Sequence, residues 1–285
     1  MSRAKTVGTY RRLPSALAAL LLCWLALVGI SRAESNNEGV SPTPPPSDKT
    51  GIRLSSIDFG GGYSYDGYRN WDGPYLRGTI KQNADTSWTL GVARVASFSD
   101  SGALFLGGLT RYFGSKWWAD FNLASSYGGF YLPAFSTDAT FHKKWLARGK
   151  LVTSFGLGYD HFKDEHNTYR WPVSLGYELN PRWRVEGGVS FAYTKPNPSA
   201  SREQFVSISY GRDRKYSVSV RGEFGHQSYE IIPPNVGISD FASHAVSVNW
   251  RQWLRRDFGF NVGAEYYSSV YYPSRSVNLG FFKDF

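Results

Sequence analysis

Two stretches in the second half of the chain decide the fold: WRVEGGVSFAY at residues 183–193 and YSVSVRGEFG at residues 216–225. In the first, the odd positions from Trp183 to Tyr193 are apolar, aromatic or glycine, whereas the even positions include Arg184 and Glu186. The second stretch alternates in the same way, with its apolar residues on the even positions. Successive side chains of a strand point to opposite faces, so both stretches predict strands with one apolar and one polar face.

The same alternation recurs along the chain, at residues 151–160, 171–178, 205–211, 258–267 and 277–285. These predicted strands run for about 9–11 residues or more, which is the length a membrane strand needs, whereas ordinary strands have about 5–6. Aromatic residues lie near the ends of the apolar faces, where a membrane barrel carries its interface girdles. The candidate girdle residues are Trp183, Tyr193, Tyr216, Phe224 and Tyr266. The predicted fold class is therefore all-β, as a single antiparallel transmembrane β-barrel.

The connections between these stretches predict about fourteen strands, within a range of twelve to sixteen. Short turns are expected near residues 83–85, 114–115, 147–149, 180–182, 212–214 and 255–257. Longer loops are expected at 66–72, 128–136, 162–168, 195–201, 228–241 and 270–275, with one short loop at 99–102. Tight periplasmic turns that alternate with longer outer loops are typical of outer-membrane barrels, so both termini are expected in the periplasm. Pro172 interrupts a predicted strand, where we expect a bulge or a strand end.

The N-terminal region predicts export from the cytoplasm. Residues 1–33 combine a basic start, an apolar run at 16–30 and a Ser-Arg-Ala site, which defines a cleaved signal peptide. Residues 34–50 are rich in proline and predict a disordered periplasmic lead, so the barrel is expected over residues 51–285. Without residues 1–33 the 32 basic residues fall by 5 to 27, against 23 acidic ones. A net charge of +4 gives no reason to expect a nucleic-acid partner.

The polar faces of the predicted strands supply the candidate functional residues. The expected lumen-facing set is Arg77, Lys81, Asp120, Arg170, Glu178, Arg184, Glu186, Arg221, Glu223, Asn249, Arg251 and Glu265. These residues either line a narrow aqueous pore or pair across strands and fill the lumen. An eight-stranded barrel is filled by side chains and one of 16–18 strands leaves a channel, so about fourteen strands lie between the two cases. We favour a narrow or partly occluded pore.

The end of the chain carries a candidate assembly signal. Val277, Leu279, Phe281 and the terminal Phe285 alternate as an extended strand would require, while Lys283 departs from the apolar pattern. A segment of this kind pairs with an open sheet edge by strand addition, which is how the barrel assembly machinery is expected to recognise it.

The layout of the second half resembles the YaiO family of outer-membrane β-barrel proteins. The residues that carry the resemblance lie between 156 and 230: GLGYDHF, YRWPVSLGYEL and EQFVSISYGRDRKYSVSVRGEFGHQSYE. The resemblance would cover residues 51–285. It implies an integral outer-membrane barrel without a plug domain, and it brings no catalytic residues to this sequence.

The sequence leaves three functions open. The first is passage or export of a polar solute or glycan, the second a structural or surface-interaction barrel, and the third a lipid-modifying enzyme. No histidine lies in a nucleophile motif, so no catalytic residue, cofactor or metal is assigned, although His161 and His166 lie among carboxylates at residues 160–166. The expected partners are outer-membrane lipid and lipopolysaccharide, the barrel assembly machinery, and a polysaccharide or small polar solute.

Overall fold

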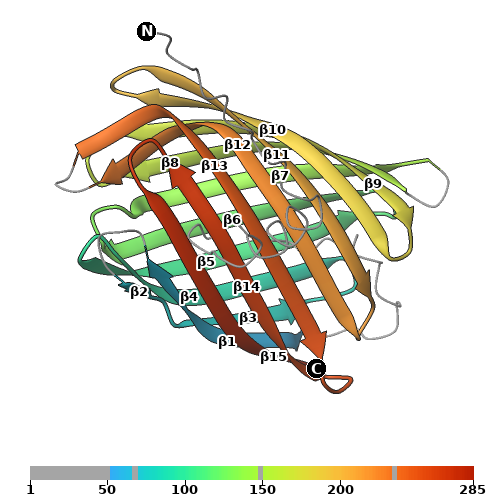
Figure 1. Ribbon diagram of the computed structural model, residues 1–285. Coiled ribbons are helices and arrows are strands. Elements are labelled where there is room, and N and C mark those ends of the chain that lie inside the picture. Colours follow the sequence, from blue (N-terminus) through green and yellow to red (C-terminus); the bar gives the residue numbers. More distant parts are fainter. Residues whose placement is uncertain (1–51, 66–69, 147–149, 233–235) are drawn as a thin grey trace, which may run out of the picture.

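The strand ladder of the computed structural model closes on itself to form a barrel (Figure 1). The structure describes residues 52–65, 70–146, 150–232 and 236–285. The first strand pairs antiparallel with the last, from Ser56 opposite Asp284 to Tyr65 opposite Arg275. Closure leaves neither the first nor the last strand with an open edge, which is what lipid demands of a spanning sheet. The predicted signal peptide and proline-rich lead lie outside the described residues.

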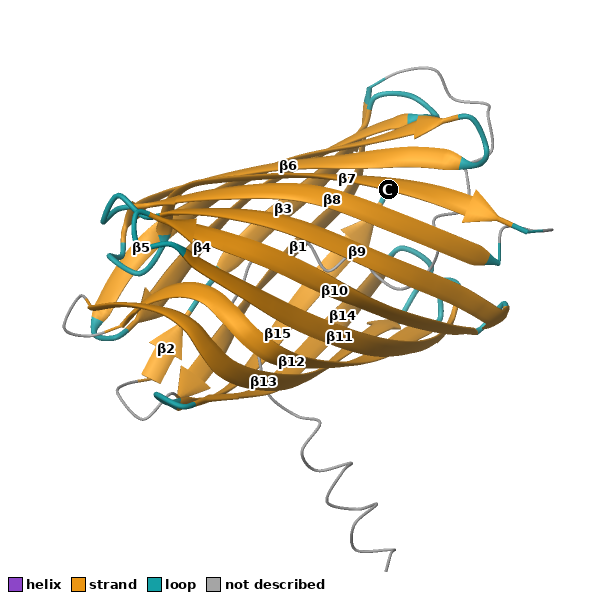
Figure 2. Cartoon of the chain, turned by 90° about the horizontal axis from the view of Figure 1, so that it is seen from above, coloured by secondary structure: helices purple, strands orange, loops and turns teal. Residues whose placement is uncertain are grey.

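All described elements are strands, tilted around a common axis (Figure 2). Within the described ranges no helix is long and apolar enough to cross a membrane. The strands are β1 (Arg53–Tyr65), β2 (Asn70–Asp72), β3 (Tyr75–Lys81), β4 (Thr86–Ser97), β5 (Asp100–Phe113), β6 (Trp117–Gly128), β7 (Pro133–Trp145), β8 (Leu151–Phe162), β9 (Asn167–Asn180), β10 (Trp183–Lys195), β11 (Ser199–Arg212), β12 (Tyr216–Ile232), β13 (Val236–Trp253), β14 (Phe258–Ser269) and β15 (Pro273–Asp284).

The barrel has fourteen wall positions, because β2 and β3 share one of them. β2 pairs with the last three residues of β1, and β3 pairs with the rest of the same edge. Gly73 and Pro74 separate the two segments. The prediction of one antiparallel transmembrane barrel of about fourteen strands is confirmed.

The two faces of the wall differ in chemistry. Paired residues share a face, so the register transfers the orientation of one strand to the next. Large apolar side chains stand exposed on the outer face, among them Leu123, Leu175, Ile208 and Leu279. This solvent-exposed apolar surface exceeds what a soluble protein tolerates, and it fits a lipid-facing band. The opposite face carries the charged residues of the lumen.

The two rims of the barrel can be told apart by the chain ends. Ile52 and Phe285 lie at one rim, where the Phe285 amide donates to the Ser55 carbonyl oxygen at 2.9 Å. This turn end also holds the connections at residues 82–85, 114–116, 181–182, 213–215 and 254–257. The opposite rim, or loop end, holds the connections at 98–99, 129–132, 163–166, 196–198 and 270–272, together with the tip of the β12–β13 hairpin.

The predicted contrast between short turns and long loops is wrong. Each of these connections has two to four residues at either rim. The segments expected as long loops largely continue as strands; in particular, residues 228–241 belong to β12 and β13 except around the hairpin tip. The polar and small residues of this segment indicate that the strands extend beyond the lipid-facing band. They do not indicate that the strands end. The turn predicted at 147–149 lies outside the described residues.

The bulge or strand end expected at Pro172 is also wrong. β9 runs through Pro172, which pairs in register with Ser190 of β10. On the other side the ladder to β8 is interrupted, yet it resumes in the same register from Phe155 opposite Val173. Gly156 makes this possible, because a Cβ at that position would lie 2.7 Å from Cγ of Pro172. A missing side chain therefore takes the place of a bulge.

We expect Gly156→Ala to lower the free energy of unfolding by about 1–3 kcal/mol, because the new methyl group overlaps the Pro172 ring. The matched control is Gly107→Ala on β5, where a Cβ meets nothing within 4 Å. Urea titration of the protein in lipid vesicles measures both variants. The double variant Gly156→Ala/Pro172→Ala should recover most of the loss. Equal stability of the two single variants would contradict the proposed contact.

Candidate functional site

The lumen is the candidate functional site, because the charged residues of the wall face it. The strand registers place the whole set expected in the lumen on the inner face: Arg77, Lys81, Asp120, Arg170, Glu178, Arg184, Glu186, Arg221, Glu223, Asn249, Arg251 and Glu265. The registers also place on the inner face residues that the sequence analysis did not assign to the lumen, among them Asp58, Asp160 and His142. Asp58 was accessible to the same alternation argument, since Ile57 and Phe59 flank it.

An ion-pair network lies inside the wall where the barrel closes. Asp58 of β1 is 3% exposed and accepts from Arg251 of β13 at 3.1 Å, with Arg77 of β3 at 3.9 Å. Arg251 also lies 3.5 Å from Asp284 and stacks over the Phe282 ring at 3.5 Å. One guanidinium thus joins β13 to both closing strands, β1 and β15. Loss of either cationic partner would leave part of the charge of this buried carboxylate uncompensated and would destabilise the fold.

Three further inner-face carboxylates, those of Asp160, Glu186 and Glu223, have arginine partners. Arg170 donates two hydrogen bonds to Asp160, at 2.9 and 3.0 Å. Arg184 lies 2.8 Å from Glu186 on the same strand, and Arg221 pairs with Glu223 at 2.5 Å. Most of these pairs link residues two apart on one strand or on adjacent strands. They therefore lie along the wall of the barrel.

Some contacts do reach across several strands and narrow the lumen near the closing seam. The bond from Arg251 to Asp58 passes over β14 and β15. Asn261 of β14 donates to the Tyr75 hydroxyl of β3 at 3.3 Å, passing over β15 and β1. Gly280 leaves room for this tyrosine, since a Cβ there would fall 2.3 Å from its hydroxyl oxygen. The seam side of the lumen is accordingly the most crowded.

A Ser–His–Asp chain lies on three adjacent strands of the inner face. The Ser154 hydroxyl is 2.8 Å from Nδ1 of His142, and Nε2 of His142 is 3.0 Å from Asp120. Thr110 donates to the same carboxylate at 2.5 Å, and Trp118 stacks on the imidazole at 4.6 Å. The order of groups is that of a catalytic triad. No sequence motif predicts this Ser–His–Asp chain, because the strand register alone brings the three residues together.

At the loop end, the β12–β13 hairpin leaves the wall. The pairing of β12 with β11 ends at Gly225, which adopts φ +140°. β13 pairs with β14 only from Ser243 onward. Beyond these points the two strands pair only with each other, up to Ile232 opposite Val236. Figure 2 shows both strands curving beyond their neighbours. The hairpin is thus free of the barrel ladder and is held by its side chains.

Tyr229 anchors the hairpin to the β8–β9 connection. Its side chain is 2% exposed, and its hydroxyl donates to Asp164. The ring stacks on His166 at 4.3 Å and meets Phe162 edge-on at 5.0 Å. Burial raises the pKa of the Tyr229 hydroxyl above its usual value, and the hydrogen bond to Asp164 is the next largest cause of the increase. The hydroxyl therefore stays protonated and remains a donor to Asp164 at physiological pH.

Aromatic residues from the other connections meet the hairpin and cross the mouth. Phe98 of the β4–β5 connection contacts Tyr272 of the β14–β15 connection at 5.7 Å. Phe130 packs against this pair and also against the cluster of Phe162, Tyr229 and Ile231. The Tyr272 hydroxyl donates to Glu230 of the hairpin at 2.5 Å. Five connections from around the rim therefore converge, and we call their contact the mouth cluster.

The carboxylates and histidines at residues 160–166 do not assemble a metal site. Asp160 pairs with Arg170, whereas Asp164 and His166 contact Tyr229. Within the described part of the chain, no group of three or more His, Cys, Asp or Glu side chains is arranged to hold a metal ion. His226 and His244 lie on β12 and β13, and His226 contacts Asp240 at 2.8 Å.

The outer face holds the expected girdle and assembly residues. By register, the lipid-facing side carries Trp183, Tyr193, Tyr216, Phe224 and Tyr266. On β15 the same side carries Val277, Leu279 and Phe281, and Phe281 stacks between Phe59 and Phe258. Lys283 continues this face, and Phe285 follows the end of the strand. Their roles at the interface and in assembly remain predictions.

This combination of a closed wall, an outer apolar band and a charged lumen defines an integral outer-membrane β-barrel protein. The model of the YaiO membrane beta barrel domain matches residues 55–230. The chain belongs to the YaiO family, and the resemblance predicted from the sequence is confirmed. No curated protein matches it by sequence.

Solved structures of a channel and of an outer membrane protein share the fold. The CymD monoaromatic hydrocarbon channel is 8% identical with a TM-score of 0.53, over 83% of this chain and 89% of that one. Omp33, an outer membrane protein of Acinetobacter baumannii, is 10% identical with a TM-score of 0.51, over 81% and 99%. The KdgM porin is 10% identical with a TM-score of 0.43, over 81% and 99%. At these identities the likeness concerns the fold alone.

We expect Asp58→Asn to lower the free energy of unfolding by about 3 kcal/mol, because Arg77 and Arg251 lose the carboxylate between them. The control is Asp257→Asn. Its partner Lys283 lies 3.7 Å away and both side chains are more than half exposed, so the loss should stay below about 1 kcal/mol. Urea titration in lipid vesicles compares the two. A loss for Asp257→Asn as large as that for Asp58→Asn would refute the network's role.

Proposed function

We propose that this barrel is a narrow passage for polar solutes, including glycans, across the outer membrane. The observation that carries the proposal is the charged inner face, which runs from Lys81 near the turn end to the Asp160–Arg170 pair nearer the loop end. A solute in transit exchanges its water for such groups, so a charged inner face fits a passage. We propose no catalytic step and no cofactor for this function.

We further propose that the turn end faces the periplasm and the loop end faces outward. Both described chain ends lie at the turn end, which fits an exported chain that arrives from the periplasm. In this orientation the mouth cluster closes the outer entrance. Passage then requires the β12–β13 hairpin to move, and the hairpin is suited to moving because no barrel ladder restrains it beyond Gly225.

We expect shortening of the hairpin to raise the single-channel conductance several-fold. Gln227 and Phe241 face each other across the hairpin, so an Asn-Gly turn can replace residues 228–240. The deletion removes Tyr229 and Glu230 from the mouth cluster. Planar-bilayer recording measures the result, and heat-modifiable migration checks that the barrel is folded. Asp240→Asn is the control, because this half-exposed residue pairs with His226 of the same hairpin.

Two outcomes of this experiment decide between functions. Absence of conductance in both wild type and shortened protein would count heavily against a passage. If the folded, shortened barrel instead loses a surface-binding phenotype, a surface-interaction role of the hairpin replaces the proposal.

A second candidate, hydrolysis, is favoured only by the Ser154–His142–Asp120 chain. Two features weigh against lipid as its substrate. Ser154 lies on the inner face, away from the acyl chains, and the strand pairing around it engages the backbone amides that an oxyanion would need. We therefore regard the chain as a hydrogen-bonded part of the lumen wall.

We expect wild type and Ser154→Ala to be equally inactive toward a water-soluble acetate ester, p-nitrophenyl acetate, at the rate of a detergent blank. The release of nitrophenolate measures the reaction. Hydrolysis by the wild type that Ser154→Ala abolishes, with the barrel still folded, would establish an enzyme in the lumen.

A further inference from the structure

The two rims of the barrel carry very different charge. We count the residues of each connection together with the two adjoining residues of each strand, within the described ranges. The turn end, with both chain ends, then holds 13 basic and 4 acidic residues, a net charge of +9. The connections of the loop end from β4 onward hold 2 basic and 3 acidic residues, a net charge of −1. The positive charge of the chain is thus concentrated at one rim.

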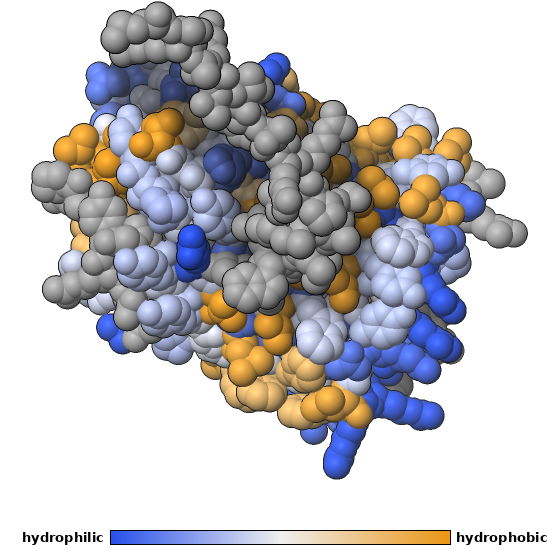
Figure 3. Space-filling model, viewed as in Figure 1, coloured by the Kyte–Doolittle hydropathy of each residue, from blue (hydrophilic) through white to orange (hydrophobic). Residues whose placement is uncertain are grey.

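The basic residues of the turn end come from every side of the rim. They are Arg53, Lys81, Lys116, Lys144, Lys150, Arg182, Arg184, Arg212, Arg214, Lys215, Arg255, Arg256 and Lys283. In Figure 3 strongly hydrophilic side chains gather along the lower right edge, on the side where Figure 1 places the C-terminus. The potentials of charges of one sign around an opening add together, so the ring produces a stronger positive potential than any one of its side chains.

Part of this ring faces the lumen. The register puts Lys81 and Lys144 on the inner face. The charged groups near Lys81 are Arg53, Arg214 and Asp284, so cations outnumber the one carboxylate. Lys144 lies near Glu178 and near Arg184, whose guanidinium group also pairs with Glu186. Lys81 and Lys144 therefore present two ammonium groups to an anion that enters the lumen at this rim.

The next layer of the lumen does not oppose an anion. Glu186 and Glu223 are each paired with an arginine on the same strand, and Asp58 is held between two. Paired carboxylates are close to neutral at a distance, so the field at the entrance is set by the rim itself. The combination of a positive mouth and a compensated lumen selects by the sign of charge at entry.

We propose that the turn-end mouth is an anion-collecting vestibule, and that the solute of this barrel is anionic: a glycan or small molecule that carries carboxylate, sulfate or phosphate groups. This inference rests on the proposed passage of solute. The chemistry required is an anionic group within reach of Lys81, Lys144 and the arginines around them. A neutral sugar would gain no ionic attraction from this rim.

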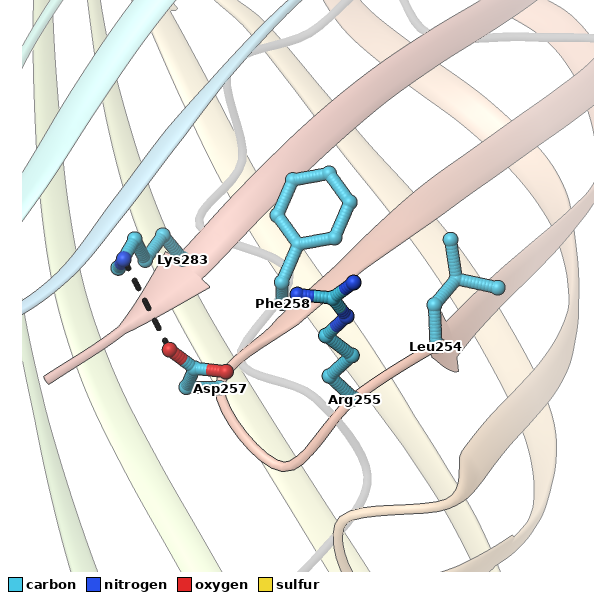
Figure 4. Close-up of a pocket in the computed structure, with 5 residues that line it drawn as sticks. All are labelled: Leu254, Arg255, Asp257, Phe258 and Lys283. Atoms are coloured by element: carbon cyan, nitrogen blue, oxygen red, sulfur yellow. Dashed lines mark ion pairs between the residues drawn. The ribbon is translucent and has the colours of Figure 1, made fainter.

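Lipid phosphate is the other source of the same chemistry, and it would bind on the outer side of the rim. Lys143, next in sequence to Lys144, points outward, with its ammonium group 3.6 Å from the Trp145 ring centre and 4.4 Å from that of Trp117. Farther round, a pocket of about 430 Å³ is lined by Leu254, Arg255, Asp257, Phe258 and Lys283 (Figure 4). Cations beside apolar groups at this level suit a phospholipid headgroup, so inner and outer variants separate the two sources.

The first test measures binding of dextran sulfate, with neutral dextran of equal length as reference, to the full-length protein in detergent. We expect dextran sulfate to bind and neutral dextran not to bind. Lys81→Gln/Lys144→Gln should weaken binding about fivefold or more, and added salt should weaken it further. The outer control Lys143→Gln/Lys283→Gln should change it by less than about twofold. Heat-modifiable migration verifies that each variant is folded.

The results separate the possible failures. If dextran sulfate and neutral dextran bind alike, the vestibule is overturned. If the outer control carries the loss and the inner variant does not, the rim serves lipid headgroups, and the anionic solute is overturned. Binding that depends on Lys81 and Lys144 in a protein that never conducts would sustain the vestibule and overturn the passage.

The second test measures the reversal potential across a planar bilayer in a potassium chloride gradient, with the shortened-hairpin protein if the wild type rarely opens. We expect preference for chloride, and Lys81→Glu/Lys144→Glu should shift the reversal potential toward that of potassium. Lys143→Glu should leave it unchanged. A conducting barrel that prefers potassium, or one whose selectivity ignores the inner lysines, overturns the inference.

Discussion

Closure of the ladder between β1 and β15 is the constraint on which the rest of the structure depends. An open edge in lipid would leave backbone amides and carbonyls without partners, at a cost of several kcal/mol for each group. The pairing from Ser56 to Tyr65 removes that edge, and the network around Asp58 and Arg251 lies directly inside it. Because the wall is complete without the β12–β13 hairpin tip, the tip can take a different conformation from the wall. The stable and the variable parts of the molecule are thereby separated.

The fold was predictable because one periodicity specifies it. Alternation along β10 and β12 assigns an inner and an outer side to each residue, and long strands require a membrane. The same argument puts Arg184, Glu186 and Arg251 on the inner side. It does not give register, so it could not bring Ser154, His142 and Asp120 together. The β12–β13 hairpin was predicted as a loop for a different reason. Composition indicates whether a side chain meets lipid, but it does not indicate whether the backbone forms strand pairs outside the membrane.

The distribution of charge shows the same limit of composition. A net charge of +9 for the whole chain does not point to a site, and removal of the predicted signal peptide lowers the net charge to +4. Only the topology reveals that 13 of the 27 remaining basic residues share one rim. Lys143 and Lys144 make the point most sharply: two identical neighbours in the sequence occupy opposite sides of the wall.

The departure of β12 from β11 at Gly225 has an evolutionary consequence. Below this residue, insertion of one amino acid would reverse the two faces of a strand and break the closed ladder. Above it, the paired arms of the hairpin can lengthen, shorten or change sequence without altering any other strand. The hairpin is therefore a module that can change while the cylinder stays the same, and two descendants of one barrel can differ in this single hairpin.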